Sequence, residues 1–278
     1  MNNRISIFYG KIVKVTIALY LTSGLLAQNM DIKIYDKQIS DEGITIYADN
    51  NEYFPVSIEL KLELKGLETM QGNGDILVLQ PRMKEQPLTT LRAIPGKSWN
   101  YRSSVRSFFG DVLISQYDTS HIYELPIARG TSEYISQGYF GKISHHQEYA
   151  LDFDLSEGTP VYAVRAGTVV KVVDNFNKSC PDASCMQYNN FIIVRHNDGT
   201  YADYAHLRQN GAMVPLGDEV AVGDLIAYSG NTGWTTGPHL HLVIFVPAVN
   251  KRKTIPTLFK IGETQSEELQ EGNSYTRY

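Results

Sequence analysis

The sequence predicts a mainly β protein, with an N-terminal β-sandwich-like domain followed by a second domain built on an antiparallel β-sheet. The chain contains 18 tyrosines, and aromatic side chains suit the pleated surface of a sheet. Residues 56–65 alternate strictly between apolar and polar side chains, which is typical of a half-buried strand. Further short apolar runs are separated by Gly, Asn and Asp. A hydrophobic content of 42% over 278 residues allows two domains with real cores.

The N-terminus has the features of an export signal. Arg4 and Lys11 precede the apolar run 15–26, which is shorter than the roughly 20 residues that a membrane span needs. We expect residues 1–27 to be a signal peptide cleaved after Ala27, leaving a periplasmic or secreted protein with no stable membrane span. The alternative is an uncleaved anchor. A lipoprotein is disfavoured because no Cys lies near the cleavage point.

Residues 28–130 are predicted to form a β-rich accessory domain. In the run 56–65 the apolar side chains share one face, and residues 44–47 and 76–79 are further strand candidates. We expect a small sandwich of immunoglobulin-like type. No motif here suggests catalysis, and the Lys/Glu face of the run 56–65 is interpreted as solvated.

Residues 131–250 are predicted to form an antiparallel sheet. Asp198-Gly199 suits a two-residue type I′ hairpin turn, which would place His206 opposite Phe191 and on the other face from His196. The strands expected in this region are 159–164, 167–173, 191–195, 201–206 and 239–246. Residues 251–278 form a polar C-terminal tail, with 255–261 as a possible last strand.

The two cysteines and the net charge limit the partners of the chain. Cys180 and Cys185 bracket a turn-like segment, so in an exported protein we expect a small disulfide loop. The alternative, a metal-binding pair, lacks further ligands at suitable spacing. A formal net charge of −5 argues against binding to nucleic acid, which depends on Lys and Arg.

Histidines in the second region carry the chemical signal. On a strand, His239 and His241 would point to the same side about 6.5 Å apart, while the leucine between them packs into the core. Both imidazoles could therefore reach one metal ion. Catalytic zinc takes three protein ligands and leaves one position for water.

An earlier segment supplies the remaining candidate ligands. It offers one His, either His145 or His146, and one Asp, either Asp152 or Asp154. Spacing alone leaves both choices open. A fifth candidate, His206, is on its own better explained as a structural residue.

Together these elements resemble a known family, the lysostaphin-type or LytM-like zinc endopeptidases. The resemblance covers roughly residues 130–250 and implies the duplicated hybrid motif fold for the predicted peptidase domain, 131–250. It rests on five motifs that occur in the family's order: Ala150-Leu151-Asp152-Phe153, Gly158-Thr159-Pro160-Val161, Tyr204-Ala205-His206-Leu207, Ser229-Gly230-Asn231-Thr232-Gly233 and Gly237-Pro238-His239-Leu240-His241.

The resemblance also implies the site. It gives one Zn²⁺ ion held by His145, Asp152 and His241, and catalytic roles for His206 and His239. Their separate roles stay open.

Two of the implied ligands depend on the family's spacing. Asp152 is chosen over Asp154 because the family's Asp stands six residues before the Gly of the Gly-Thr-Pro-Val turn. The commonest form has its ligand His four residues before that Asp, where this chain has Glu148. A longer form of the motif points to His145, which is preferred over His146.

The implied activity is hydrolysis of peptide bonds in peptidoglycan cross-links or stem peptides by a metal-activated water, with peptidoglycan as the partner. Two alternatives are an inactive regulator of other cell-wall hydrolases and a secreted protease that acts on non-wall proteins. The sequence leaves open which bond is cut, the role of the N-terminal domain and the oligomeric state.

Overall fold

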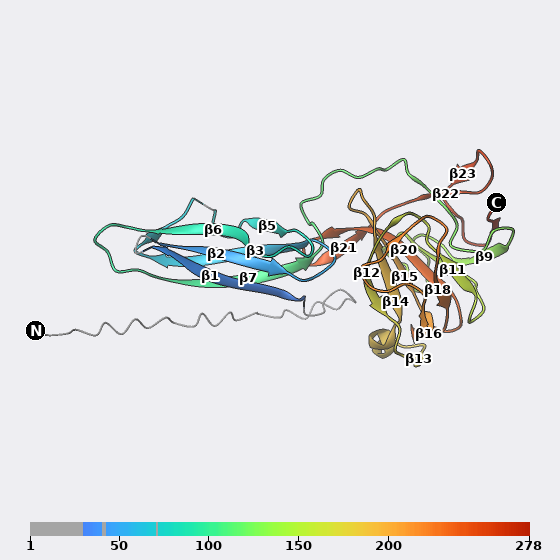
Figure 1. The fold of residues 1–278 in the computed structure, drawn as a ribbon. Helices are drawn as coiled ribbons and strands as arrows, with labels where there is room; N and C mark the ends of the chain where they lie inside the picture. Colours follow the sequence, from blue (N-terminus) through green and yellow to red (C-terminus); the bar gives the residue numbers. More distant parts are fainter. Residues whose placement is uncertain (1–29, 41–42, 71) are drawn as a thin grey trace, which may run out of the picture.

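The computed structural model describes residues 30–40, 43–70 and 72–278, and it is built almost wholly from β-strands (Figure 1). The predicted signal peptide, 1–27, lies outside the described residues. Within the described ranges the only helix is the short 3₁₀ helix η1 (Ala183–Tyr188). Among these residues no helix has the length and apolar character to span a membrane.

Two sheets form the N-terminal region. The run predicted from alternation, 56–65, is a strand over the same residues. Four of its five apolar side chains are buried and Leu64 is half-buried, whereas its charged side chains are not buried. Both sheets contribute side chains to one core. The first sheet has the order β1 (Ile32–Ser40), β2 (Gly43–Asn50), β6 (Gln86–Ala93), β4 (Leu67–Glu68), and the second has the order β5 (Ile76–Leu79), β3 (Val56–Lys65), β7 (Asn100–Phe109). The immunoglobulin-like character of the N-terminal region stays a prediction.

A nine-stranded sheet organises the second region, and every pairing in it is antiparallel. The predicted mainly β fold is therefore confirmed. The strand order of this nine-stranded sheet is β17 (Glu219–Val220), β12 (Gly167–Val173), β14 (Phe191–Arg195), β15 (Tyr201–Ala205), β20 (Leu240–Ala248), β10 (Ala150–Phe153), β9 (Ser132–Gln137), β24 (Ser274–Thr276), with β21 (Lys251–Thr254) beside β20.

Three small sheets complete the second region. They are β11 (Pro160–Tyr162) with β18 (Leu225–Ser229) and β16 (Leu207–Ala212); β13 (Ser179–Cys180) with β19 (Gly233–Trp234); and β8 (Ile122–Tyr123) with β22 (Leu258–Lys260) and β23 (Ser266–Glu267). Strand β22 lies within the predicted last strand, and β23 and β24 follow it. The domain boundaries at 130 and 250 stay predictions.

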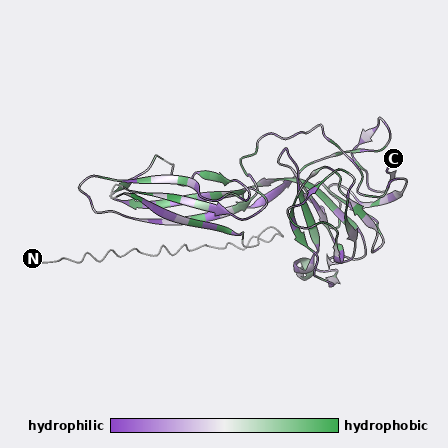
Figure 2. Ribbon diagram, viewed as in Figure 1, coloured by the Kyte–Doolittle hydropathy of each residue, from purple (hydrophilic) through white to green (hydrophobic). Residues whose placement is uncertain are grey.

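The large sheet buries both of its faces. Leu240, Leu242 and Ile244 pack into the core on one face, as the alternation predicts, whereas Val243 and Phe245 face the N-terminal sheets. Figure 2 shows hydrophobic residues along the strands of both regions.

Phe109, at the end of β7, joins the two regions. Its ring centroid lies 4.3 Å from that of Phe54, 5.0 Å from that of Tyr201 and 6.1 Å from that of Phe245. One core therefore continues from the N-terminal sheets to the large sheet.

The hairpin between β14 and β15 differs from the predicted one. Phe191 faces Ala205 and not His206, because the loop holds three residues, 197–199, and Gly199 adopts a φ of 83°. An Asp-Gly pair also suits such a loop, in which a turn is followed by a left-handed glycine. The predicted register was wrong by one residue, and His206 lies just beyond the strand.

Cys180 and Cys185 form a disulfide, as predicted. The bridge closes the segment that contains the start of η1, and this segment pairs with β19 through β13.

We expect Phe109→Ala to lower the free energy of unfolding by about 3 kcal/mol, because it removes a ring that is only 7% exposed and leaves a cavity between the regions. Urea denaturation followed by tyrosine fluorescence measures this change. The control is Phe140→Ala, since Phe140 is 51% exposed. Equal small losses in the two variants would contradict a shared core.

Candidate metal and catalytic site

Strand register brings Asp152 and His241 together. Asp152 on β10 lies directly opposite His241 on β20, and His241 also faces Ala205 on β15. Paired residues project to the same face of a sheet, so the two side chains meet. Asp152 Oδ1 lies 2.8 Å from His241 Nδ1.

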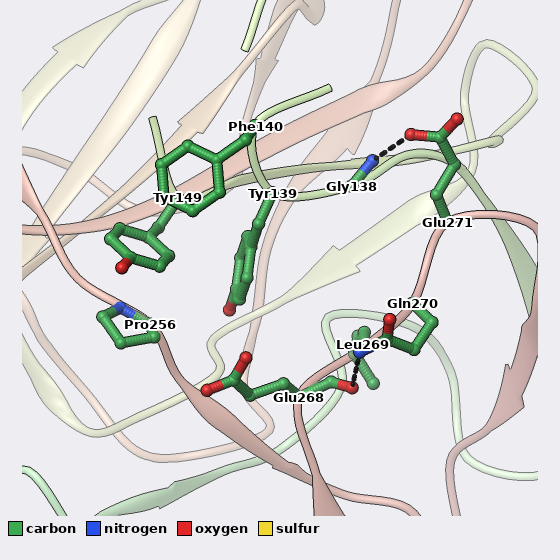
Figure 3. A pocket seen from close by; sticks show the side chains of 9 residues that line it. All are labelled: Gly138, Tyr139, Phe140, Tyr149, Pro256, Glu268, Leu269, Gln270 and Glu271. Carbon is green, nitrogen blue, oxygen red and sulfur yellow. Dashed lines mark hydrogen bonds between the residues drawn. The ribbon is translucent and has the colours of Figure 1, made fainter. Parts of the chain in front are cut away.

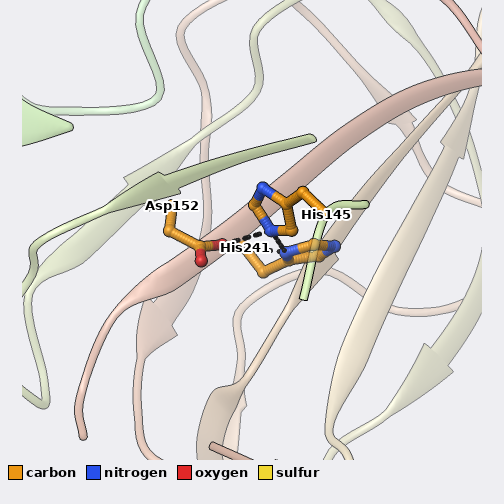
Figure 4. A group of neighbouring side chains, drawn as sticks. All are labelled: His145, Asp152 and His241. Atoms are coloured by element: carbon orange, nitrogen blue, oxygen red, sulfur yellow. Dashed lines mark hydrogen bonds and ion pairs between the residues drawn. The ribbon is translucent and has the colours of Figure 1, made fainter. Parts of the chain in front are cut away.

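His145 reaches the same point from the loop between β9 and β10 (Figure 4). Its Nε2 lies 3.2 Å from Asp152 Oδ1 and 3.2 Å from His241 Nδ1. Its Nδ1 donates a hydrogen bond of 3.0 Å to the Gly138 carbonyl, which can only accept. The proton on Nδ1 leaves the Nε2 lone pair directed at the other two residues.

The spacing of these three atoms suits a metal ion. The ligand atoms of His145, Asp152 and His241 all lie within 4.8 Å of one another. Ligands at 2.0–2.1 Å from a tetrahedral zinc stand about 3.3 Å apart, which is close to the contacts of this group. Two imidazole nitrogens and a carboxylate are also a donor set that zinc accepts.

The electrostatics of the group favour a cation. Burial alone would raise the pKa of Asp152, but the neighbouring imidazoles of His145 and His241 hold it well below its usual range. Burial would lower the pKa of His145, and the Asp152 carboxylate overrides this effect and raises it. A negative carboxylate therefore stands permanently between two imidazoles.

The structure separates the two pairs that spacing left open. His146 and Asp154 are exposed and lie outside the group, whereas His145 and Asp152 are buried within it. Their roles as ligands remain a proposal.

His206 and His239 stand beside this group. Their ring centroids lie 4.6 Å apart, and the ring of His206 is 5.8 Å from that of His241. His206 Nδ1 donates to the Thr232 carbonyl at 2.7 Å, and His239 Nδ1 donates to the Gly237 carbonyl at 2.9 Å. Each imidazole, when neutral, therefore keeps a lone pair on Nε2.

The backbone at His206 turns its side chain out of the pleat. Its φ is 62°, and its N–H donates to the side chain of Asn189 at 3.0 Å. Desolvation, followed by the neighbouring His239 and His241, lowers the pKa of His206 to about 3. His206 is thus neutral, and able to accept a proton, at ordinary pH.

Several residues that support this group were not predicted from the sequence. Gln137 Nε2 donates to Asp152 Oδ2 at 2.8 Å, and Arg252 bridges Glu148 at 2.9 Å and Asp203 at 2.8 Å. Glu148, at the position of the commonest family ligand, thus pairs with an arginine. These residues belong to none of the five motifs.

His196 and His121 take no part in the site. His196 is 1% exposed and bonded to Thr200, and burial lowers its pKa to about 3. The two histidines lie with Tyr123, whose ring both contact.

Comparison with known proteins finds relatives of the second region. An uncharacterized metalloprotease of Haemophilus influenzae is 35% identical over 126 residues, which is 45% of this chain and 23% of that protein. Peptidoglycan DD-endopeptidase ShyC of Vibrio cholerae is 31% identical over 127 residues, 45% of this chain and 25% of that protein. The chain thus matches about a quarter of the length of these relatives.

A solved structure also matches this region. The catalytic domain of the antimicrobial peptidase lysostaphin from Staphylococcus simulans is 30% identical, with a TM-score of 0.33, and the match covers 45% of this chain and 87% of that one. The profile of peptidase family M23 matches residues 146–255, which include four of the five candidate site residues and stop one residue short of His145. Residues 146–255, the part of the chain that holds most of the candidate site, thus match peptidase family M23.

Proposed function

We propose that the protein is a zinc-dependent endopeptidase that hydrolyses peptide bonds of peptidoglycan cross-links or stem peptides. The observation that carries the proposal is the meeting of His145, Asp152 and His241 at one point, with two further imidazoles beside them. Zinc would be held by these three residues and, when bound, would supply Lewis-acid activation of water and of the scissile carbonyl.

The chain's own residues would move the protons. His206 and His239 each present Nε2 to the site, since their Nδ1 atoms are bonded to carbonyls. The Nε2 of one neutral imidazole would accept the proton of the attacking water. The other would act in its protonated form, in which Nε2–H stabilises the developing oxyanion or gives its proton to the leaving amine. We assign the two roles to the pair jointly.

The substrate class follows from relatives whose names describe peptidoglycan endopeptidases. We propose the predicted arrangement with it: an exported protein, periplasmic or secreted, in which residues 131–250 are the peptidase domain and 28–130 an accessory domain. The regulator alternative is disfavoured because all five candidate site side chains are present together.

Zinc-loaded protein, residues 28–278, should release new peptide termini from purified sacculi, as read by mass spectrometry. His206→Ala should lower this activity at least about a hundredfold, because it removes a proton-transfer group. The matched control is His121→Ala, a half-buried histidine outside the site, which should stay active. Intact sacculi would sink the proposal. Cleavage of casein but not of sacculi would favour a protease of non-wall proteins.

Asp152→Ala should abolish stoichiometric zinc binding, whereas Asp154→Ala should retain it, because only the carboxylate of Asp152 contacts both imidazoles. Metal analysis after dialysis measures the zinc content, and the rise in melting temperature on adding zinc gives a second readout. Equal zinc content in the two variants would contradict this ligand set.

The apparent zinc affinity should fall as the pH is lowered. The pKa of His145 is raised, so its proton is held to a higher pH than usual and competes with the metal. Isothermal titration between about pH 5 and 8 measures the effect. A zinc affinity that rises as the pH is lowered would contradict this prediction.

A further inference from the structure

The C-terminal segment reaches back to the loop that carries His145. Glu271 Oε2 accepts a hydrogen bond of 3.1 Å from the N–H of Gly138 (Figure 3). The carbonyl of the same Gly138 accepts the bond from His145 Nδ1 at 3.0 Å. Gly138 is therefore held on one side by Glu271 while it holds the imidazole on the other. All three residues lie outside the range 146–255 that the family profile matches.

The contact between Glu271 and Gly138 is close as well as polar. A Cβ placed on Gly138 would stand 3.2 Å from both the Cβ and the N of Glu271, so a larger residue would push the two segments apart. Gly138 is buried, whereas Glu271 lies at the surface.

The segment around Glu271 is well anchored. Leu269 is 2% exposed and Tyr275 is 7% exposed, and both belong to the main core. Just before the paired residues of β24, Gly272 N donates to Ile135 O at 3.0 Å and Ile135 N donates to Asn273 O at 2.9 Å. The position of Glu271 is therefore fixed by packing and backbone pairing, independently of His145.

The neighbouring residue extends the same support to a second ligand. Gln137 Nε2 donates to Asp152 Oδ2 at 2.8 Å, and Gln137 Oε1 accepts from the N–H groups of Ile143 and Ser144 at 3.0 Å. Gln137 and Gly138, at and just beyond the end of β9, thus contact two of the three candidate ligands, and Glu271 extends the contact with the C-terminal segment to Gly138.

We propose that Glu271 is a positioning residue of the metal site, acting through Gly138 to hold His145 with its Nε2 toward the metal. The inference rests on the proposed ligand set but not on the proposed substrate. Partners that orient metal-bound histidines fix the ring and its tautomer, and their loss typically weakens metal affinity about 10–100-fold.

The test compares Glu271→Ala, Glu271→Gln and Glu268→Ala. Zinc dissociation constants come from competition with a chelator on the full chain. Glu271→Ala should bind zinc about tenfold more weakly, at the lower end of the range for such partners because Glu271 acts through one residue. Glu271→Gln should bind almost as the parent does, since its amide oxygen can still accept the Gly138 N–H.

Glu268→Ala is the control for charge. Glu268 lies on the same segment and lines the same pocket of about 390 Å³, but its carboxylate points away from Gly138 in Figure 3. It should bind zinc as the parent does. Equal weakening in Glu268→Ala, or a Glu271→Gln variant as weak as Glu271→Ala, would show a general charge effect and overturn the inference.

A second readout does not need zinc. In the metal-free protein, ¹⁵N NMR shifts should show His145 with its proton on Nδ1, and Glu271→Ala should give a mixture of tautomers. An unchanged tautomer together with an unchanged zinc affinity would overturn the positioning role. A parent protein that binds no zinc would overturn the ligand set and this inference together, whereas zinc binding without cleavage of sacculi would overturn only the proposed activity.

Discussion

The pairing of Asp152 with His241 across β10 and β20 is the constraint on which the site depends. Because side chains alternate along a strand, a slip of one residue would turn both groups into the apolar core and bring leucines into their place. The register is held by the opposite face, where Leu151, Leu240 and Leu242 are almost fully buried. The hydrophobic core thus determines the position of the polar site.

Around that pair, the remaining groups come from loops whose shape is set by hydrogen bonds. His145 depends on the Gly138 carbonyl, and His206 depends on a left-handed backbone beside Asn189. The segment closed by the disulfide precedes Asn189 and pairs with β19. The residue just before β19 is Thr232, whose carbonyl accepts the hydrogen bond from His206. Polar groups that are buried and fully bonded in this way give an imidazole one orientation and one tautomer.

Sequence patterns predicted the parts of the fold that are periodic. The alternation at 56–65 and the His-x-His before an apolar run both give strands with the expected faces. The predicted register of the β14–β15 hairpin was wrong because an Asp-Gly pair suits loops of two and of three residues. Spacing could not separate His145 from His146, since a loop has no period. Gln137 and Glu271 carried no signal because their contacts join segments distant along the chain.

The aromatic contact at Phe109 has a consequence for dividing the chain. A fragment cut between β7 and β8 would expose Tyr201 and Phe245 to water, on the face of the large sheet that the N-terminal strands now cover. Exposed apolar patches of this kind promote aggregation. The N-terminal sheets therefore act as a permanent lining of the second region, and a soluble minimal fragment would need polar replacements on that face.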